Sequence, residues 1–331
     1  MLRRLIPDPF LPILVGTVLL ATLLPARGSF ATLVGWLSTI TIILLFFFHG
    51  AKLAREQVVA GLVHWRLHLV IFSATFVMFP LIGLAGERLA PGLLPPKLWT
   101  GLLFVCALPS TVQSSIAFVS IARGNVPAAI ASASVSQVLG IVFTPILMGL
   151  LAGAHGSGVG LAGIGKIAAE IMVPFLAGHL LRPVIGGWVG RHKQLVNTTD
   201  RATIVIAVYG AFSEAVIEGL WHQLPAASLG MLLVADAALL AIALSATWAA
   251  GRLLGFDRED RIAIQFCGTK KSLVQGVPMA RVLFPGPDVG VILLPIMLFH
   301  QMQLMACAII ARRYAEGERD HAPAPPFAVR S

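Results

Sequence analysis

Charged residues are scarce in this sequence. Asp, Glu, Lys and Arg together make up 12% of the 331 residues, whereas hydrophobic residues make up 57%. Soluble domains carry about a quarter charged residues because their surfaces must face water. This small number of charges cannot cover a soluble core of this size. The composition therefore excludes an ordinary soluble protein and indicates helices that face lipid.

The sequence also has few cysteines and lacks the common catalytic motifs. Cys106, Cys267 and Cys307 lie in apolar stretches without metal-ligand spacing, which argues against a disulfide framework or a zinc site. Neither a G-x-S-x-G motif nor a Gly-rich phosphate loop is present. We therefore expect no enzyme activity, no cofactor and no metal centre, with Na⁺ or H⁺ left open as a coupling ion.

The net charge of +9 comes from Lys and Arg in short gaps between apolar stretches. A nucleic-acid-binding protein would gather these residues on one polar face. Their placement instead fits a membrane protein, which concentrates positive charge in its cytoplasmic loops. We expect a lipid bilayer as the partner and no nucleic acid.

Ten stretches are apolar enough to cross a bilayer, which takes about 20 residues in a helix. They lie at 10–24, 30–49, 67–86, 98–122, 127–152, 164–181, 202–220, 225–254, 262–284 and 289–311. Arg3 and Arg4 before the first stretch imitate a signal peptide, but we expect this stretch to be retained. The prediction is an all-α integral membrane protein with one transmembrane domain over 1–315 and a disordered tail over 316–331.

The distribution of positive charge predicts the orientation. With ten spans, most of the 24 Lys and Arg residues fall in gaps on the same side as both termini. The positive-inside rule makes that side the cytoplasm. Short loops and Ala-, Gly- and Leu-rich spans suit the inner (plasma) membrane of a bacterium.

Two polar interruptions divide the ten spans into matching halves. The fourth span is broken at 108–115 and the ninth at 268–276, about 160 residues apart. A five-helix unit that is repeated must insert upside down, and broken helices at matching positions are typical of transporters. We predict two inverted five-helix repeats, at about 9–152 and 162–312.

Polar side chains gather at and beside these breaks. Hydroxyl and amide groups come from the first break, from the following span and from the second break, as Gln113, Ser114, Ser115, Ser132, Ser134, Gln137 and Gln275. An unwound stretch inside a bilayer survives only where protein or a water cavity surrounds it. These residues are candidate substrate or ion ligands, although serines can also serve only close helix packing.

Lys270 and Lys271 lie in the middle of the ninth span. A lysine near the bilayer centre costs about 2.5–3.5 kcal/mol on insertion scales. The pair could snorkel to an interface if the span were misplaced. Otherwise they supply a fixed charge for an anionic substrate, an amine for proton exchange, or a replacement for a bound cation.

Buried lysines favour acidic partners. Asp236 lies deep in the eighth span and Glu214 in the seventh. We hypothesise an ion pair between Asp236 and Lys270 or Lys271, with Glu214 as a second candidate.

Five segments resemble the bile acid:sodium symporter family, and more closely its divergent SBF-like branch. They are FHGAKL at 48–53, WRLH at 65–68, TFVMFP at 75–80, ALPSTVQSS at 107–115 and CGTKKSL at 267–273. The resemblance covers nearly the whole chain. It implies a panel domain and a core domain, with the broken fourth and ninth spans crossing and the two domains rocking to give alternating access.

The resemblance also implies two cation sites beside the crossing. The first would use Ser114 and Ser115 with Ser132 and Ser134, and the second would use the position of Thr75. Family members carry an acid before Gly-x-Gln-Asn in the ninth span, where this sequence has Cys267 and then Gly268-Thr269-Lys270-Lys271. Because two ammonium groups repel Na⁺, we predict that a lysine amine takes the place of the cation.

The sequence therefore predicts a symporter-like secondary active transporter of a small organic anion, proton-linked or uncoupled. Three alternatives stay open. The first is a sodium-coupled symporter of bile acids or other organic anions. The second is a membrane-embedded enzyme that acts on lipid. Its best candidate metal ligands would be His64 and His68, which lie four residues apart. The third is a channel or regulatory membrane protein without turnover.

Overall fold

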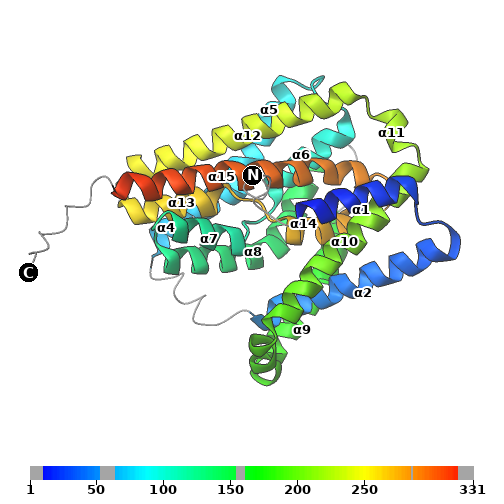
Figure 1. Ribbon diagram of the computed structural model, residues 1–331, viewed down its shortest axis with the longest axis horizontal. Helices are drawn as coiled ribbons and strands as arrows, with labels where there is room; N and C mark the ends of the chain where they lie inside the picture. The colour runs from blue at the N-terminus through cyan, green and yellow to red at the C-terminus, as the bar shows by residue number, and fades with distance from the viewer. Residues whose placement is uncertain (1–9, 53–63, 154–160, 285, 320–331) are drawn as a thin grey trace, which may run out of the picture.

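The computed structural model describes residues 10–52, 64–153, 161–284 and 286–319, and these residues form helices joined by turns (Figure 1). The helices in chain order are α1 (Leu11–Leu23), α2 (Gly28–Lys52), α4 (Trp65–Ser73), the π-helix η2 (Ala74–Met78), α5 (Phe79–Leu89), α6 (Pro96–Ala107), α7 (Gln113–Ile121), α8 (Val126–Gly153), α9 (Leu161–Arg191), α10 (Lys193–Ile217), α11 (Leu220–Gln223), α12 (Ala226–Leu253), α13 (Arg258–Thr269), α14 (Leu273–Leu283) and α15 (Val289–Arg319).

Six of the helices in the described ranges are long and apolar enough to cross a bilayer. They comprise α2, the continuous run Trp65–Leu89, α8, the Ile171–Arg191 part of α9, α12 and α15. Two shorter apolar helices cover Pro12–Leu23 and Pro96–Ala107. The described residues are thus helical, as predicted, and six of their helices have the length and composition of membrane spans.

Several predicted boundaries are wrong. The sixth and seventh spans were expected to end at 181 and begin at 202, but α9 runs to Arg191 and α10 starts at Lys193. The residues of this gap continue the two helices beyond the apolar stretches, and Asp200 at the end of the gap is buried. Helix α15 runs to Arg319, so the first residues of the predicted tail are helical, and 320–331 lie outside the described residues.

The helices pack in two groups. Helices α2, α9 and α10 contact one another, α1 packs on α10, and the four helices occupy the right and the bottom of Figure 1. Helices α4 to α8 and α12 to α15 form the second group. The groups meet where α10 touches α14 and α15 and where α9 touches α8. The two broken helical segments, α6–α7 and α13–α14, both belong to the second group.

Helices α2 and α9 approach each other closely because two glycines face the opposite backbone. A Cβ on Gly50 would overlap the carbonyl group of Phe175, and one on Gly178 would overlap that of Phe47. Small residues allow such contacts between helices in membranes, where lipid supplies no hydrophobic drive for association. This contact joins α2 to α9 within the first group of helices.

We predict that Gly50→Ala lowers the melting temperature of the purified protein. The added methyl group must push α2 away from α9, and overpacking of this kind costs about 1–3 kcal/mol. Gly35→Ala, on the same helix, is the matched control because a Cβ there meets nothing within 4 Å. Equal effects of the two substitutions in a thermal unfolding assay would contradict the close contact.

Candidate functional site

The first break follows from Pro109. A proline disfavours helical backbone at the residue before it, and Leu108 is extended, with φ −73° and ψ 151°. The freed backbone groups find partners on α8, since the Ser110 amide donates to Ser136 Oγ at 3.0 Å and Thr144 Oγ1 donates to the Ala107 carbonyl at 2.9 Å. The unwound stretch is thus stabilised by the helix beside it.

The second break depends on a glutamine of α15. Gln303 accepts from the Lys271 amide and donates to the Lys271 carbonyl, both at 2.8 Å. Ser272 then caps α14 by accepting from the amide of Gln275 at 3.3 Å. One amide side chain therefore replaces the two hydrogen bonds that a continuous helix would have made at Lys271.

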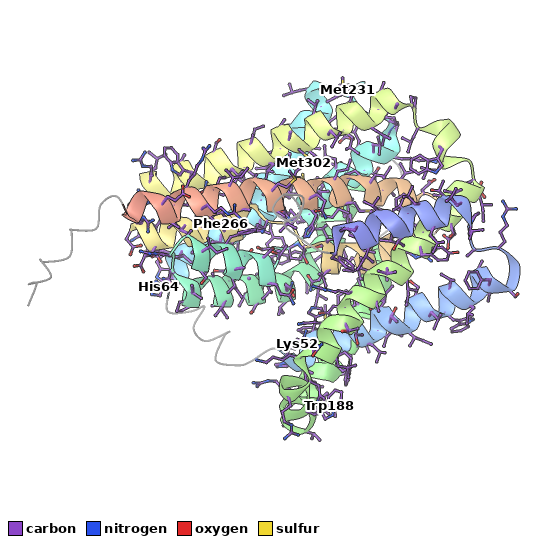
Figure 2. All side chains as sticks on the ribbon, in the orientation of Figure 1. Lys52, His64, Trp188, Met231, Phe266 and Met302 are labelled. Carbon is purple, nitrogen blue, oxygen red and sulfur yellow. The ribbon has the colours of Figure 1, made fainter. Side chains whose placement is uncertain are left out.

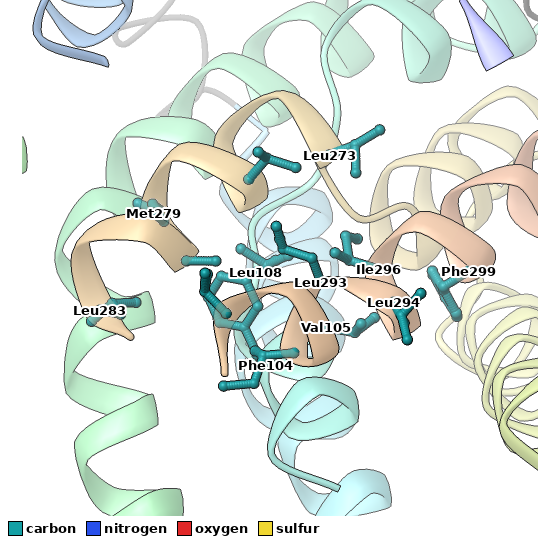
Figure 3. Close-up of a cluster of buried hydrophobic side chains, with 14 of the residues drawn as sticks. Phe104, Val105, Leu108, Leu273, Met279, Leu283, Leu293, Leu294, Ile296 and Phe299 are labelled. Atoms are coloured by element: carbon teal, nitrogen blue, oxygen red, sulfur yellow. The ribbon is translucent and has the colours of Figure 1, made fainter. Parts of the chain in front are cut away.

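The two breaks touch each other. The Ser272 amide donates to the Pro109 carbonyl at 2.9 Å, which joins the unwound stretches directly. Apolar side chains of α6, α14 and α15 pack next to this bond, among them Phe104, Leu108, Met279 and Ile296 (Figure 3). The predicted meeting of the two breaks is confirmed by this contact.

The Lys271 amine is enclosed by three backbone carbonyl groups. Its Nζ donates to the carbonyl oxygens of Thr75 at 2.8 Å, Cys106 at 2.9 Å and Leu108 at 2.8 Å. The same Nζ lies 4.1 Å from the centre of the Phe79 ring, and the side chain is fully buried. Three oxygen ligands and an aromatic face form a site suited to a single positive charge.

The π-helix η2 explains why the Thr75 carbonyl is available. In a regular helix it would accept from the amide of Phe79, but that amide donates to Ala74 instead. The next residue is Pro80, which has no amide hydrogen to donate. The carbonyl group of Thr75 therefore needs a donor from another helix, and Lys271 supplies it.

Lys270 has a different environment from its neighbour. Its Nζ lies 4.0 Å from the centre of the Phe118 ring and, among the described residues, has no hydrogen-bond partner. The side chain is fully buried. Lys270 ends α13, where a positive charge complements the negative end of the helix dipole.

A cavity of about 370 Å³ lies where α7 and α14 begin. This volume is in the range of small-molecule pockets, about 300–1,000 Å³. The first residues of both helices line it, together with polar groups of α2, α8, α10 and α15, including Gln113, Ser114, Ser134, Gln137, Ser272, Gln275, His49, His300, Asn197, Asp200, Lys52 and Arg201. The cavity thus joins the two breaks to the first group of helices.

The four helix ends at the crossing have opposite electrostatic roles. The carboxyl ends of α6 and α13 carry partial negative charge, and a buried lysine lies at each. The amino ends of α7 and α14 carry partial positive charge and open into the cavity. The cavity is therefore suited to an anion.

The predicted site residues divide into three sets. Gln113, Ser114, Ser134, Gln137 and Gln275 line the cavity. Thr75, Ser115, Ser132, Lys270 and Lys271 are fully buried and do not line it. Asp236 is also fully buried but contacts neither lysine through a hydrogen bond, and Glu214 is partly exposed and lies outside the cavity.

The hypothesised ion pair of Asp236 is absent. Both carboxylate oxygens of Asp236 lack a hydrogen-bond partner in the part of the chain that the structure describes. Lys271 is satisfied by carbonyl groups instead. Glu214 pairs with Arg281 through contacts of 3.1 and 3.2 Å, so it is also not a partner of the lysines.

The two histidines lie in different surroundings and do not point to one shared site. His68 is buried and its Nδ1 lies 2.7 Å from Ser132 Oγ, whereas His64 is exposed at the start of α4. Within the described ranges, no group of three His, Cys, Asp or Glu side chains is placed to hold a metal ion.

Sequence reasoning missed several residues of the site. Lys52, Asp200 and Arg201 were assigned to gaps between spans, but they line the cavity, and Lys52 contacts Asp200 at 3.4 Å. Gln303 was missed although its signal was present, since a glutamine in an apolar span is costly unless it has a partner. The carbonyl ligands of Lys271 leave no signal in the sequence.

Fold and site together define a helical membrane protein with a small-molecule cavity between two broken helices, as in secondary transporters. The model of the SBF-like CPA transporter family matches residues 8–316. The chain belongs to this family of transporters, which confirms the resemblance inferred from its motifs.

Similar proteins come from bacteria and vertebrates. An uncharacterised protein of Pseudomonas aeruginosa is 54% identical over 322 residues, which are 97% of each chain. YfeH of Escherichia coli strain K12, whose name proposes a symporter, is 49% identical over 307 residues, 93% of this chain and 92% of that one. Sodium/bile acid cotransporter 7 of Rattus norvegicus is 28% identical over 277 residues, 82% and 81% of the two chains.

We predict that replacing Lys271 lowers the melting temperature, whereas replacing Lys270 does not. Lys271→Met leaves three buried carbonyl groups without donors, and each unsatisfied group costs about 1–3 kcal/mol, so the melting temperature should fall clearly. Lys270→Met removes a buried amine that has no hydrogen-bond partner in the described structure, so the melting temperature should stay or rise.

Thermal unfolding of the purified variants in one detergent measures this difference. The two variants change the same residue type at adjacent, fully buried positions, so each controls for the other. A loss for Lys270→Met as large as for Lys271→Met would contradict the carbonyl site.

Proposed function

We propose that the protein is a secondary active transporter that carries a small organic anion by alternating access. The substrate binds in the cavity at the crossing of α6–α7 with α13–α14. The observation that carries this proposal is the arrangement of helix ends, in which two positive ends open into the cavity while lysines lie at the two negative ends. The protein is not an enzyme in this account.

The charge around the cavity favours an anion. Lys52 and Arg201 line it, against one acidic residue, Asp200. Gln113, Asn197 and Gln275 add amide groups to the lining. A carboxylate or sulfonate could thus be bound by helix amides and a few side chains, with the apolar part of the molecule against Phe10, Val138 and Phe175.

The proposed carrier has ten spans in two inverted repeats. Matching helices support this, because α7 and α14 begin about 160 residues apart, as do α4 and α12. The first group of helices, α1, α2, α9 and α10, corresponds to a panel domain, and the second group to a core domain. Both termini lie in the cytoplasm of a cell whose inner membrane holds the protein.

The coupling ion is proposed to be a proton or none, with Lys271 in the place of a cation. Unwound carbonyl groups and helix carboxyl ends are the ligands that sodium-coupled carriers offer to Na⁺. Here those oxygens are bound by an amine. Sodium coupling is the second candidate, favoured by the printed name of the rat relative.

Transport in proteoliposomes tests the proposal. We expect saturable counterflow of a labelled organic anion, tested with taurocholate and with small carboxylates, and an unchanged rate when K⁺ replaces Na⁺ at fixed pH. Uptake that rises with Na⁺ at fixed pH would contradict the role of Lys271. Lack of counterflow with every anion of the panel would contradict the carrier.

Arg201 provides a second test. Because it lines the cavity, Arg201→Gln should weaken anion binding and raise KM by about fivefold or more, with a smaller change in kcat. Arg191→Gln is the matched control, since Arg191 is exposed nearby but lines neither described cavity. Equal KM changes in the two variants would show a general charge effect rather than a site.

A further inference from the structure

A second cavity lies at the end of the α2–α9 pair. Its volume is about 790 Å³, and it is bounded by the end of α2, the last three turns of α9 and the start of α10. Its lining includes Lys52, Arg182, Gly187, Gly190 and Lys193. Of these five residues, only Lys52 also lines the substrate cavity.

The groove is basic. Among the described residues that line it, Lys52, Arg182 and Lys193 are cationic and none is acidic. Lys52 pairs with Asp200 at 3.4 Å and also lines the first cavity, so Arg182 and Lys193 are the two cations that line only the groove. A single anion with several oxygen atoms, such as a phosphate group, matches a cluster of Lys and Arg side chains.

Glycines keep the floor of the groove open. A Cβ on Gly187 or Gly190 would meet nothing within 4 Å. A group of the size of a phosphate ester can therefore approach the α9 backbone between the basic side chains.

The groove also adjoins an exposed apolar surface of the same helix. Leu180 and Val184 are 76% and 80% exposed, and Trp188 follows one turn later. Figure 2 shows Trp188 and Lys52 at the same end of the helix pair. Tryptophan is enriched at membrane–water interfaces, so we expect the leucine and valine to face acyl chains and the groove to lie at headgroup level.

We propose that this groove binds the phosphate headgroup of an anionic phospholipid. Basic pockets between membrane helices at headgroup level are known to take such headgroups. The acyl chains would follow the exposed face of α9. The groove shares Lys52 and Asn197 with the substrate cavity, whereas Arg182, Lys193 and the α9 glycines line only the groove. The proposal does not depend on which anion the protein transports.

Binding of defined lipids to the purified full chain tests the proposal. Short-chain phosphatidylglycerol is titrated into detergent-solubilised protein, with phosphatidylcholine and inorganic phosphate as parallel probes, and the occupied fraction is read by native mass spectrometry. We expect phosphatidylglycerol to bind and the other two probes to bind at least tenfold more weakly.

Variants then locate the site. Removing one positive charge near the headgroup should weaken binding about fivefold, so Lys193→Gln and Arg182→Gln should each show this loss. Arg312→Gln and Arg313→Gln are the controls, because both residues are exposed at the end of α15 and lie outside the groove. Lys193 is exposed, so its substitution tests the idea even if Arg182→Gln impairs folding.

Three results would overturn the proposal. Equal losses in the groove variants and the control variants would show a diffuse surface charge effect. Equal binding of phosphatidylcholine would remove the role of the anionic headgroup. Inorganic phosphate that binds as tightly as the lipid would identify a free phosphate site.

Discussion

The bond between the Lys271 amine and three backbone carbonyl groups is the interaction on which the crossing depends. Those carbonyl groups come from η2 and from the end of α6, and the amine comes from the stretch between α13 and α14. In a bilayer no water replaces a missing donor, so unwound backbone must be satisfied by protein. One side chain thereby allows two broken helices and a π-helix to meet.

The carboxyl ends and the amino ends of the broken helices have different surroundings. Lys271 donates to carbonyl groups at the carboxyl end of α6, and Lys270 follows the carboxyl end of α13. The amino ends of α7 and α14 open to the cavity. In a sodium-coupled carrier a positive charge arrives with the ion, whereas in the proposed mechanism it belongs to the chain, so its desolvation occurs during folding instead of during each transport cycle.

Much of this arrangement could be predicted from the sequence. Pro109 and the polar run after it indicated the first break, and two lysines inside an apolar span indicated the second. The partner of the lysines could not be predicted, because charge pairing favoured Asp236 and backbone carbonyl groups leave no trace in the residue letters. The π-helix at Thr75 was equally hidden, since it shows only as Pro80 one turn later in an ordinary apolar span. Lys52 and Arg201 were placed in loops because hydropathy ends a span where charge begins, although the helices continue.

The central claim is that an amine, and not an ion, occupies the oxygen cage at the crossing. The most direct measurement is an experimental structure of the lipid-embedded protein in sodium buffer, at a resolution that shows side chains and bound ions. The account predicts Lys271 Nζ within hydrogen-bond distance of the carbonyl oxygens of Thr75, Cys106 and Leu108. A Lys271 side chain turned into the cavity, with a sodium ion among those three oxygens, would contradict it.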